Sequence, residues 1–170
     1  KIVFILVISA CLLDFIFTNV YGKSSERNKI QAVINGNIKN YDVLILGSSR
    51  ANNHIVTSEF SKKNIQAFNF GMSGSSLEEA ALLLQLMIEK KWNIKNVLLE
   101  VDLNVNSESY SDGTRALYMP YLRNKTISNY YKSSENFNSL YYVLFYRYVV
   151  YEAKIGVREL FFSFMKRKSN

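Results

Sequence analysis

A serine that follows a short apolar run is the first residue in this sequence that could act as a nucleophile. Ser49 lies in the turn Gly47-Ser48-Ser49-Arg50, directly after the apolar residues 43–46, and a polar stretch that could open a helix comes next. A buried strand that delivers a small-residue turn to the start of a helix is a common way to present a nucleophile or bind an anion. The pattern predicts that Ser49 is a catalytic serine. The alternative is that Ser49 only caps the helix.

Two further groups of small or polar residues follow predicted strands in the same way. Residues 66–70 predict a second strand that ends in Gly71-Met72-Ser73-Gly74, and residues 97–103 predict a third strand that ends near Asn104. Short strand–helix–strand connections imply parallel strands with right-handed crossovers, and ligands bind at the carboxyl ends of such strands. We therefore expect the three turns to lie at one edge of a sheet. Simple chain reversal at the glycines and strand capping by Asn104 are the alternatives.

The segments between these strands predict the helices of an α/β domain. Residues 52–62 predict a short helix or an irregular segment, and residues 77–91 predict a helix rich in Leu and Ala. Ser75 or Ser76 is expected to cap the second of these helices, because serine is a preferred N-cap residue. These helices would cover the sheet and hold its three turns in place.

The length of the chain suits about one domain, and its composition argues against nucleic-acid, disulfide and Cys/His metal sites. The 170 residues are 48% hydrophobic, and the net charge of +7 comes from basic residues that are scattered along the chain, so we expect no nucleic-acid partner. Cys11 and His54 are the only residues of their types, which excludes an internal disulfide and a Cys/His metal cluster. No ligand spacing indicates a carboxylate metal site, and we expect no cofactor.

The first part of the chain predicts attachment to a membrane. Residues 1–20 are predominantly apolar, which predicts a transmembrane helix or signal anchor with the rest outside the cytoplasm, in the periplasm or at the cell surface. A buried core helix or strand is one alternative. The residues Ile8-Ser9-Ala10-Cys11 offer another, since they are similar to a lipoprotein cleavage box. Residues 21–40 predict a linker and a short helix before the first strand.

The last part of the chain is less informative. Residues 105–135 are polar and irregular, and a long loop there could line a substrate cleft. Residues 137–165 are apolar and rich in tyrosine, which predicts one long helix or two. We expect this segment to pack on the sheet or on further sequence. A position at the membrane surface is the alternative.

The three turns, in this order, resemble the SGNH (GDSL-like) hydrolase family. Gly47-Ser48-Ser49 is similar to the family's Gly-Asp-Ser block, with Ser48 in place of the Asp. Asn69-Phe70-Gly71-Met72-Ser73-Gly74 fits its Asn-x-Gly-x-x-Gly block, and Asn104 is similar to the asparagine of its third block. The GSSR form behind an apolar segment resembles the membrane-anchored branch that acts on cell-envelope or extracellular polysaccharides. The resemblance covers about residues 41–105.

The resemblance implies a fold and a set of roles. The fold would be a three-layer, flavodoxin-like α/β parallel sheet flanked by helices, with an N-terminal membrane helix; residues 41–170 would form this domain, incompletely. Ser49 would attack an ester, and donors at Ser49, Gly74 and Asn104 would stabilise the oxyanion. The function would be that of a serine esterase or O-acyltransferase acting on acyl groups of an acylated glycan, through an acyl-serine intermediate. The direction of transfer and any protein partners stay open.

The family's fourth block, an Asp-x-x-His that supplies the base, is absent from the sequence. His54 lies five residues after Ser49, which in a helix is more than one turn, so its side chain should point away from the serine. We expect the base in sequence beyond Asn170, so that the full-length protein is an enzyme. The alternatives are a catalytically inactive relative, a membrane-anchored module that binds a glycan or anion, and a membrane-anchored scaffold.

Overall fold

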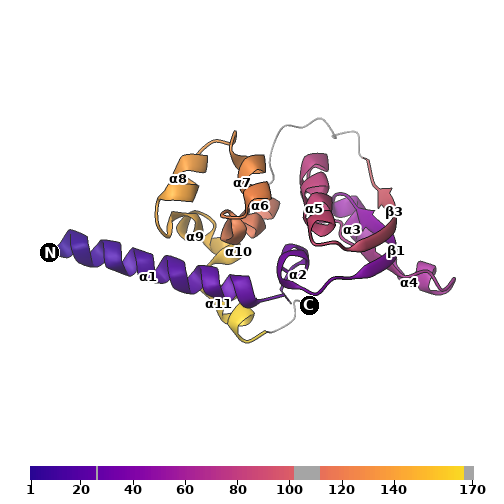
Figure 1. Ribbon diagram of the computed structural model, residues 1–170, viewed down its shortest axis with the longest axis horizontal. Helices are drawn as coiled ribbons and strands as arrows, with labels where there is room; N and C mark the ends of the chain where they lie inside the picture. Colours follow the sequence, from indigo (N-terminus) through magenta and orange to yellow (C-terminus); the bar gives the residue numbers. More distant parts are fainter. Residues whose placement is uncertain (26, 102–111, 167–170) are drawn as a thin grey trace. The chain divides into compact units, whose positions relative to one another are not determined.

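The computed structural model describes residues 1–25, 27–101 and 112–166 (Figure 1). The chain is a mixed α/β protein with a small parallel sheet, flanking helices and a long apolar helix at its N-terminus. It divides into two compact units. The sheet unit comprises residues 37–115, and the helical unit comprises residues 1–36 and 116–170. The predicted single domain over residues 41–170 therefore corresponds to the sheet unit and part of the helical unit.

The sheet unit is built on three parallel strands in the order β2-β1-β3. The central strand β1 (Asn40–Leu46) pairs with β2 (Ala67–Asn69) on one side and with β3 (Asn93–Leu99) on the other. The apolar run of β1 ends in three buried residues, Leu44, Ile45 and Leu46. The predicted parallel sheet is confirmed for these three strands, and the three-layer, flavodoxin-like arrangement stays a prediction.

The third strand begins and ends earlier than residues 97–103. Pairing starts at Asn40 with Asn93 and runs to Leu46 with Leu99. The strand ends there because β1, its only partner within the described residues, turns away at Gly47. Among the strands that the structure describes, β3 is an outer one, and its apolar residues 97–99 are exposed.

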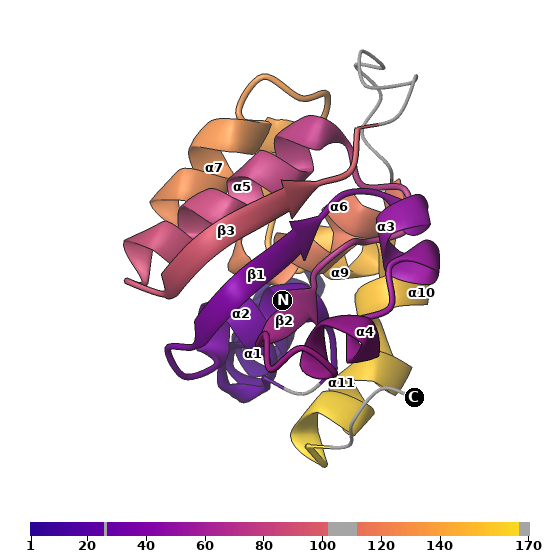
Figure 2. The same ribbon diagram turned by 90° about the vertical axis from the view of Figure 1, so that its right-hand side faces the viewer.

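Three helices complete the sheet unit. Residues 52–62, predicted as a short helix or irregular segment, overlap two short helices, α3 (Ser49–His54) and α4 (Ser58–Ser61). The longer α5 (Leu77–Glu89) agrees with the predicted helix and lies along one face of the sheet (Figure 2). The Ser76 hydroxyl accepts a hydrogen bond from the Glu79 N–H, and the Glu79 carboxylate accepts one from the Ser76 N–H, which forms a capping box.

The helical unit contains the apolar helix α1 (Ile2–Lys23). Its other elements are short, and α6 crosses from the sheet unit into it. They are α2 (Lys29–Asn35), α6 (Asp112–Tyr118), η1 (Met119–Tyr121), α7 (Lys125–Tyr131), α8 (Phe137–Tyr142), α9 (Tyr146–Val150), α10 (Glu152–Ile155) and α11 (Val157–Phe164). The prediction of one or two helices over residues 137–165 is therefore wrong, since four short helices form there. Of the elements in this unit, α2, η1 and α11 pack against α1.

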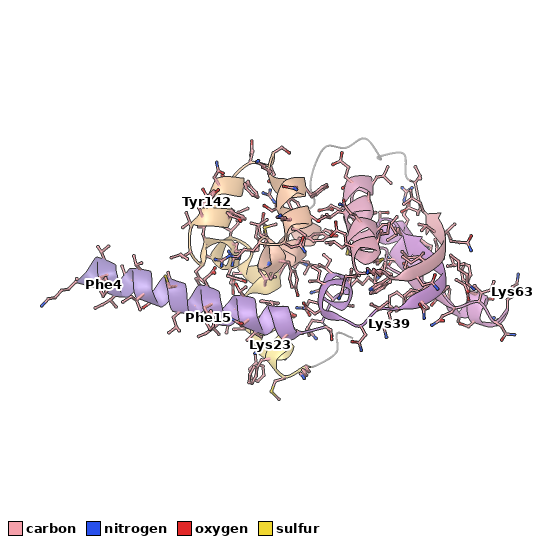
Figure 3. The ribbon with its side chains drawn as sticks, viewed as in Figure 1. Phe4, Phe15, Lys23, Lys39, Lys63 and Tyr142 are labelled. Carbon is pink, nitrogen blue, oxygen red and sulfur yellow. The ribbon has the colours of Figure 1, made fainter. Side chains whose placement is uncertain are left out.

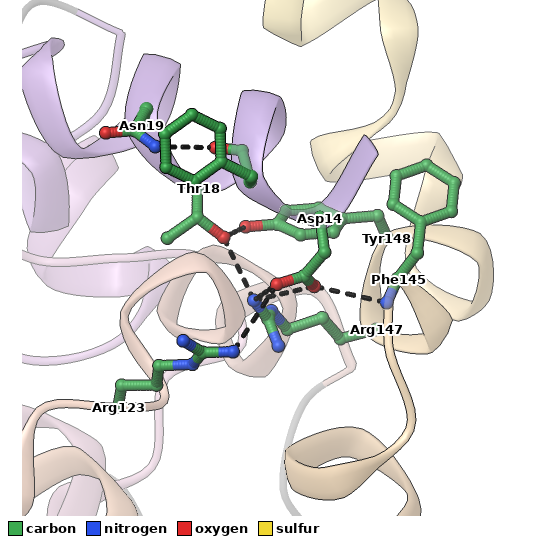
Figure 4. A network of polar contacts seen from close by, with 8 residues as sticks. Asp14, Thr18, Asn19, Arg123, Phe145, Arg147 and Tyr148 are labelled. Atoms are coloured by element: carbon green, nitrogen blue, oxygen red, sulfur yellow. Dashed lines mark hydrogen bonds and ion pairs between the residues drawn. The ribbon is translucent and has the colours of Figure 1, made fainter. Parts of the chain in front are cut away.

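Helix α1 has a free half and a packed half. Its first half exposes large apolar side chains such as Phe4 (Figure 3). In the second half, Asp14, Phe17 and Tyr21 are buried. The Asp14 carboxylate pairs with Arg147 at 2.9 Å. It also accepts a hydrogen bond from the backbone N–H of Phe145 at 3.1 Å (Figure 4). This bond holds the chain at Phe145, whose φ of 62° separates α8 from α9.

Candidate functional site

The first turn of the candidate site depends on Gly47. Its φ is +146°, a conformation that side chains rarely adopt. A Cβ at this position would lie 2.7 Å from a carboxylate oxygen of Glu100 and 3.0 Å from the Ala51 side chain. The glycine therefore lets the chain leave β1 sharply and enter α3 while Glu100 lies directly against the turn.

Ser48 has a structural role at the start of α3. Its hydroxyl accepts a hydrogen bond from the backbone N–H of Arg50, which makes Ser48 the N-cap. Both the backbone N–H and the hydroxyl of Ser48 donate to one oxygen of Glu100, at 2.9 and 2.8 Å. The bond from the Ser48 N–H is the main reason why the pKa of the Glu100 carboxyl is held below its usual value.

Glu100 is the residue of this site that sequence reasoning missed. It directly follows β3, and its backbone N–H still donates to the carbonyl of Leu46. This bond brings the side chain to the end of β1. The sequence does show an ionisable residue directly after an apolar run, which is a common position for a site residue. Its partner, Ser48, lies 52 positions away, so the sequence could not show the contact.

Ser49 is the first residue of α3 and is half-buried. Within the described residues its hydroxyl forms no hydrogen bond, in contrast to that of Ser48. The capping role that was the alternative for Ser49 belongs to its neighbour. The Ser49 hydroxyl is therefore not committed to holding the turn together.

The second turn, residues 71–74, is fixed against α3 by Asn69. The Asn69 side-chain amide donates to the carbonyls of Ala51 and Ile55, at 2.6 and 2.9 Å, and its oxygen accepts from the Gly71 N–H at 2.9 Å. A Cβ on Gly71 would lie 2.7 Å from the backbone nitrogen of Asn52. The first two landmarks of the Asn-x-Gly-x-x-Gly block thus pack the turn onto the helix that carries Ser49.

The two turns are also joined directly. The backbone N–H of Met72 donates to the carbonyl of Gly47 at 3.0 Å. The hydroxyl of the buried Thr114 donates to the carbonyl of Ser73 at 3.2 Å, which holds the far side of the second turn. Gly74 comes next, is exposed, and has a φ of +78°. The structure thus places the Gly74 turn beside the Ser49 turn, with no hydrogen bond between Ser49 and Gly74 themselves.

The remaining predicted residues are placed differently. Asn104 lies outside the described residues, so its position in the site stays a prediction. His54 lies in the last turn of α3 and is exposed. Five residues of helix separate it from Ser49 by about 7.5 Å along the axis and about 140° around it. The two side chains therefore leave α3 on different sides.

The part of the chain that the structure describes offers few residues that could bind a metal ion or accept the Ser49 proton. There, no three His, Cys, Asp or Glu residues form a group that could hold a metal ion. The Glu100 carboxylate is hydrogen-bonded to Ser48, the residue before Ser49. The hydrogen bonds that it accepts from Ser48 favour its charged form and occupy one of its oxygens. These contacts suit a residue that positions the turn better than one that accepts a proton.

Comparisons with family models, characterised proteins and solved structures find no match to this chain. The relation to SGNH hydrolases therefore remains a prediction from the order of the three sequence blocks.

Proposed function

We propose that Ser49 is the nucleophile of an SGNH-type serine esterase or O-acyltransferase. Its substrates would be ester-linked acyl groups, such as acetyl groups, on cell-envelope or extracellular polysaccharide. The observation that carries the proposal is the division of roles between two adjacent serines. Ser48 caps α3 and binds Glu100, which leaves the hydroxyl of Ser49 available at the end of the central strand.

The chemistry assigned to this turn is acyl transfer. The Ser49 oxygen would attack the ester carbonyl carbon, its proton would pass to a general base, and the glycan oxygen would leave as an alcohol. Water or a second hydroxyl would then release the acyl group from Ser49. The backbone N–H groups of Ser49 and Gly74, with the Asn104 amide, are the proposed oxyanion donors, and the loss of one such donor lowers rates by roughly a hundred- to a thousand-fold.

The base must come from a residue other than His54. The orientation of His54 on α3 and its distance from Ser49 along the helix leave it unable to take the proton. The proposal therefore requires a histidine held by an acidic residue, as in an Asp-x-x-His block, in the full-length protein.

We further propose that α1 anchors the protein in a membrane with the sheet unit outside the cytoplasm. The helix is 22 residues long, and by length and composition it could cross a bilayer. Only 11% of its most apolar window is buried within the protein. Such exposure suits lipid contact better than a place in a protein core.

Covalent labelling tests the nucleophile. Membranes from cells expressing the full-length protein would be treated with a fluorophosphonate probe, which modifies activated serines. We expect the wild type and Ser73→Ala to be labelled and Ser49→Ala to be unlabelled. Ser73 is a matched control because it is an exposed serine in the neighbouring turn. Labelling that persists in Ser49→Ala would exclude Ser49 as the nucleophile.

The second candidate is a non-catalytic module that binds a glycan or an anion at the same turns. One observation favours it: within the described residues, no acidic or basic side chain contacts the Ser49 hydroxyl. This candidate predicts an unlabelled wild type that still binds polysaccharide. It also predicts that Ser49→Ala leaves this binding unchanged or weakens it only modestly.

A further inference from the structure

The helical unit carries an apolar and aromatic surface on α8–α11 that the described residues leave exposed. We call it the α8–α11 surface and define it by Tyr142, Val149, Val150, Val157, Phe161 and Phe164. These side chains are 48 to 72% exposed. Isolated exposed apolar residues are common, but a group of them on three helices, α8, α9 and α11, indicates a site of interaction.

This surface is continuous with α1. The hydroxyls of Thr18 and Tyr148 are 2.9 Å apart, which ties α9 to the second half of α1. Arg27 forms a bidentate salt bridge with Glu159 of α11, with hydrogen bonds of 2.8 and 3.0 Å. The short helices are therefore fixed beside α1 and would be carried with it to the membrane.

Helix α1 is long enough to cross a bilayer. Its 22 residues span about 33 Å, close to the hydrocarbon thickness of about 30 Å. Helices α9 and α11 contact the second half of α1, so the boundary of a bilayer crossed by α1 would lie near these helices.

The polar contacts at this level suit such a boundary. Asp14 and Arg147 are both buried and paired, so neither brings an unpaired charge to the membrane. Lys154, Arg158 and Lys166, in the same stretch of chain, are exposed and outnumber the exposed Glu152, which suits contact with anionic headgroups. Tyrosine and phenylalanine beside cationic residues are typical of the interfacial layer.

An apolar pocket lies within the same region. It has a volume of about 310 Å³ and a mainly apolar lining that includes one carboxylate: Phe17, Phe145, Tyr148, Val149, Glu152, Gly156 and Val157. A pocket of this lining beside a membrane helix suits part of a lipid acyl chain.

We infer that the α8–α11 surface is embedded in the interfacial layer of the bilayer. The helical unit would then contact the membrane through its short helices as well as through α1. This inference rests on the proposed membrane anchoring by α1. It makes a bilayer containing anionic lipid the partner of this surface.

Tryptophan quenching in vesicles tests the inference. Trp92, the only tryptophan, would be replaced by Phe, and single tryptophans introduced as Phe164→Trp, Tyr142→Trp, Phe4→Trp and Ile88→Trp. Each full-length variant would be reconstituted into phosphatidylcholine–phosphatidylglycerol vesicles with and without bromine-labelled acyl chains. Phe4→Trp reports α1 itself. Ile88→Trp is the matched control, because Ile88 is an exposed apolar residue of the sheet unit.

We expect bromolipid to reduce the emission of Phe164→Trp and Tyr142→Trp nearly as much as that of Phe4→Trp, and to leave Ile88→Trp little changed. Quenching of Phe4→Trp alone would overturn the inference and leave membrane anchoring intact. Loss of quenching in Phe4→Trp as well would overturn both. Shielding of the two surface positions from aqueous iodide without bromolipid quenching would assign the surface to a protein partner or a second copy, and would also overturn the inference.

Discussion

Glu100 accepts both hydrogen bonds that Ser48 donates at the end of the central strand, from the backbone N–H at 2.9 Å and from the hydroxyl at 2.8 Å. A carboxylate at the end of β3 thus fixes the turn at the end of β1. Because the N-cap of α3 belongs to the same serine, the orientation of α3 and of Ser49 depends on this contact.

Removal of the Glu100 side chain should weaken the sheet unit. Hydrogen bonds to a charged group contribute about 1.5–3 kcal/mol, and the partial exposure of Glu100 lowers this, so Glu100→Ala should reduce the free energy of unfolding by about 1–2 kcal/mol. Urea unfolding of the full chain in mild detergent, followed by the fluorescence of the buried Trp92, measures the loss. Glu59→Ala is the control: it breaks an exposed pair with Lys62 and should change stability by less than about 1 kcal/mol. Equal losses would contradict the assigned role.

The same contact predicts a dependence on pH. The pKa of Glu100 is lowered in the folded protein by the Ser48 N–H. Its contribution is therefore complete above the unfolded-state pKa of about 4.3 and disappears as the pH falls through the lower folded-state pKa. The wild type should lose stability more steeply than Glu100→Gln as the pH falls below about 5. Parallel pH profiles of the two proteins would exclude this linkage.

Asn69 should be difficult to replace. Its amide group donates to two carbonyls around the end of α3, and a carboxylate there would face those carbonyls without a proton to donate. Asn69→Asp should therefore destabilise the sheet unit by about 1–3 kcal/mol and reduce labelling at Ser49. The Trp92 unfolding curve and fluorophosphonate labelling report the two effects. Asn53→Asp, at an exposed position of α3, should show neither.

Gly71 tests how closely the second turn must approach α3. The methyl group of Gly71→Ala would lie 2.7 Å from the Asn52 nitrogen and 2.8 Å from the Ala51 side chain. Relief of this overlap should cost about 1–3 kcal/mol and displace the helix that begins with Ser49. Gly22→Ala is the comparison, since nothing lies within 4 Å of the added carbon there. If both variants unfold like the wild type by Trp92 fluorescence, the close packing is not essential.

The Asp14–Arg147 pair should be tested by single and double replacement. Asp14→Leu would leave the Arg147 guanidinium buried beside α1 without its counterion and should cost about 3–5 kcal/mol. The double variant Asp14→Leu/Arg147→Met removes both charges and should recover much of that loss. Thermal unfolding in detergent, followed by near-ultraviolet circular dichroism of the tyrosines, measures each. A double variant that is as unstable as Asp14→Leu would show that the Phe145 N–H contact with Asp14 matters more than the charge.

Local pattern was sufficient for much of the sheet unit. The apolar residues 43–46 form the end of β1, β2 lies within the predicted residues 66–70, and α5 begins after a serine cap as expected. In each case the decisive information, an apolar run or a cap beside a helix start, lies within a few residues.

Long-range contacts account for what the sequence could not show. Asn93, Lys95 and Asn96 are polar, yet they belong to β3 because the backbone of this stretch pairs with β1 and their side chains are exposed at the edge of the sheet. The contact of Glu100 with Ser48 has no local signature. The break at Phe145 depends on Asp14, 131 residues earlier, so the apolar composition of residues 137–165 could not reveal it.

The exposed side of β3 also affects how the protein can be handled. Val97, Leu98 and Leu99 are each 42% exposed, and successive residues of a strand face opposite sides of a sheet. An outer strand that is apolar on both sides is a template onto which another extended chain can add. Preparations refolded from denaturant should therefore aggregate as their concentration rises, and a lysine in place of Leu98 should keep them dispersed.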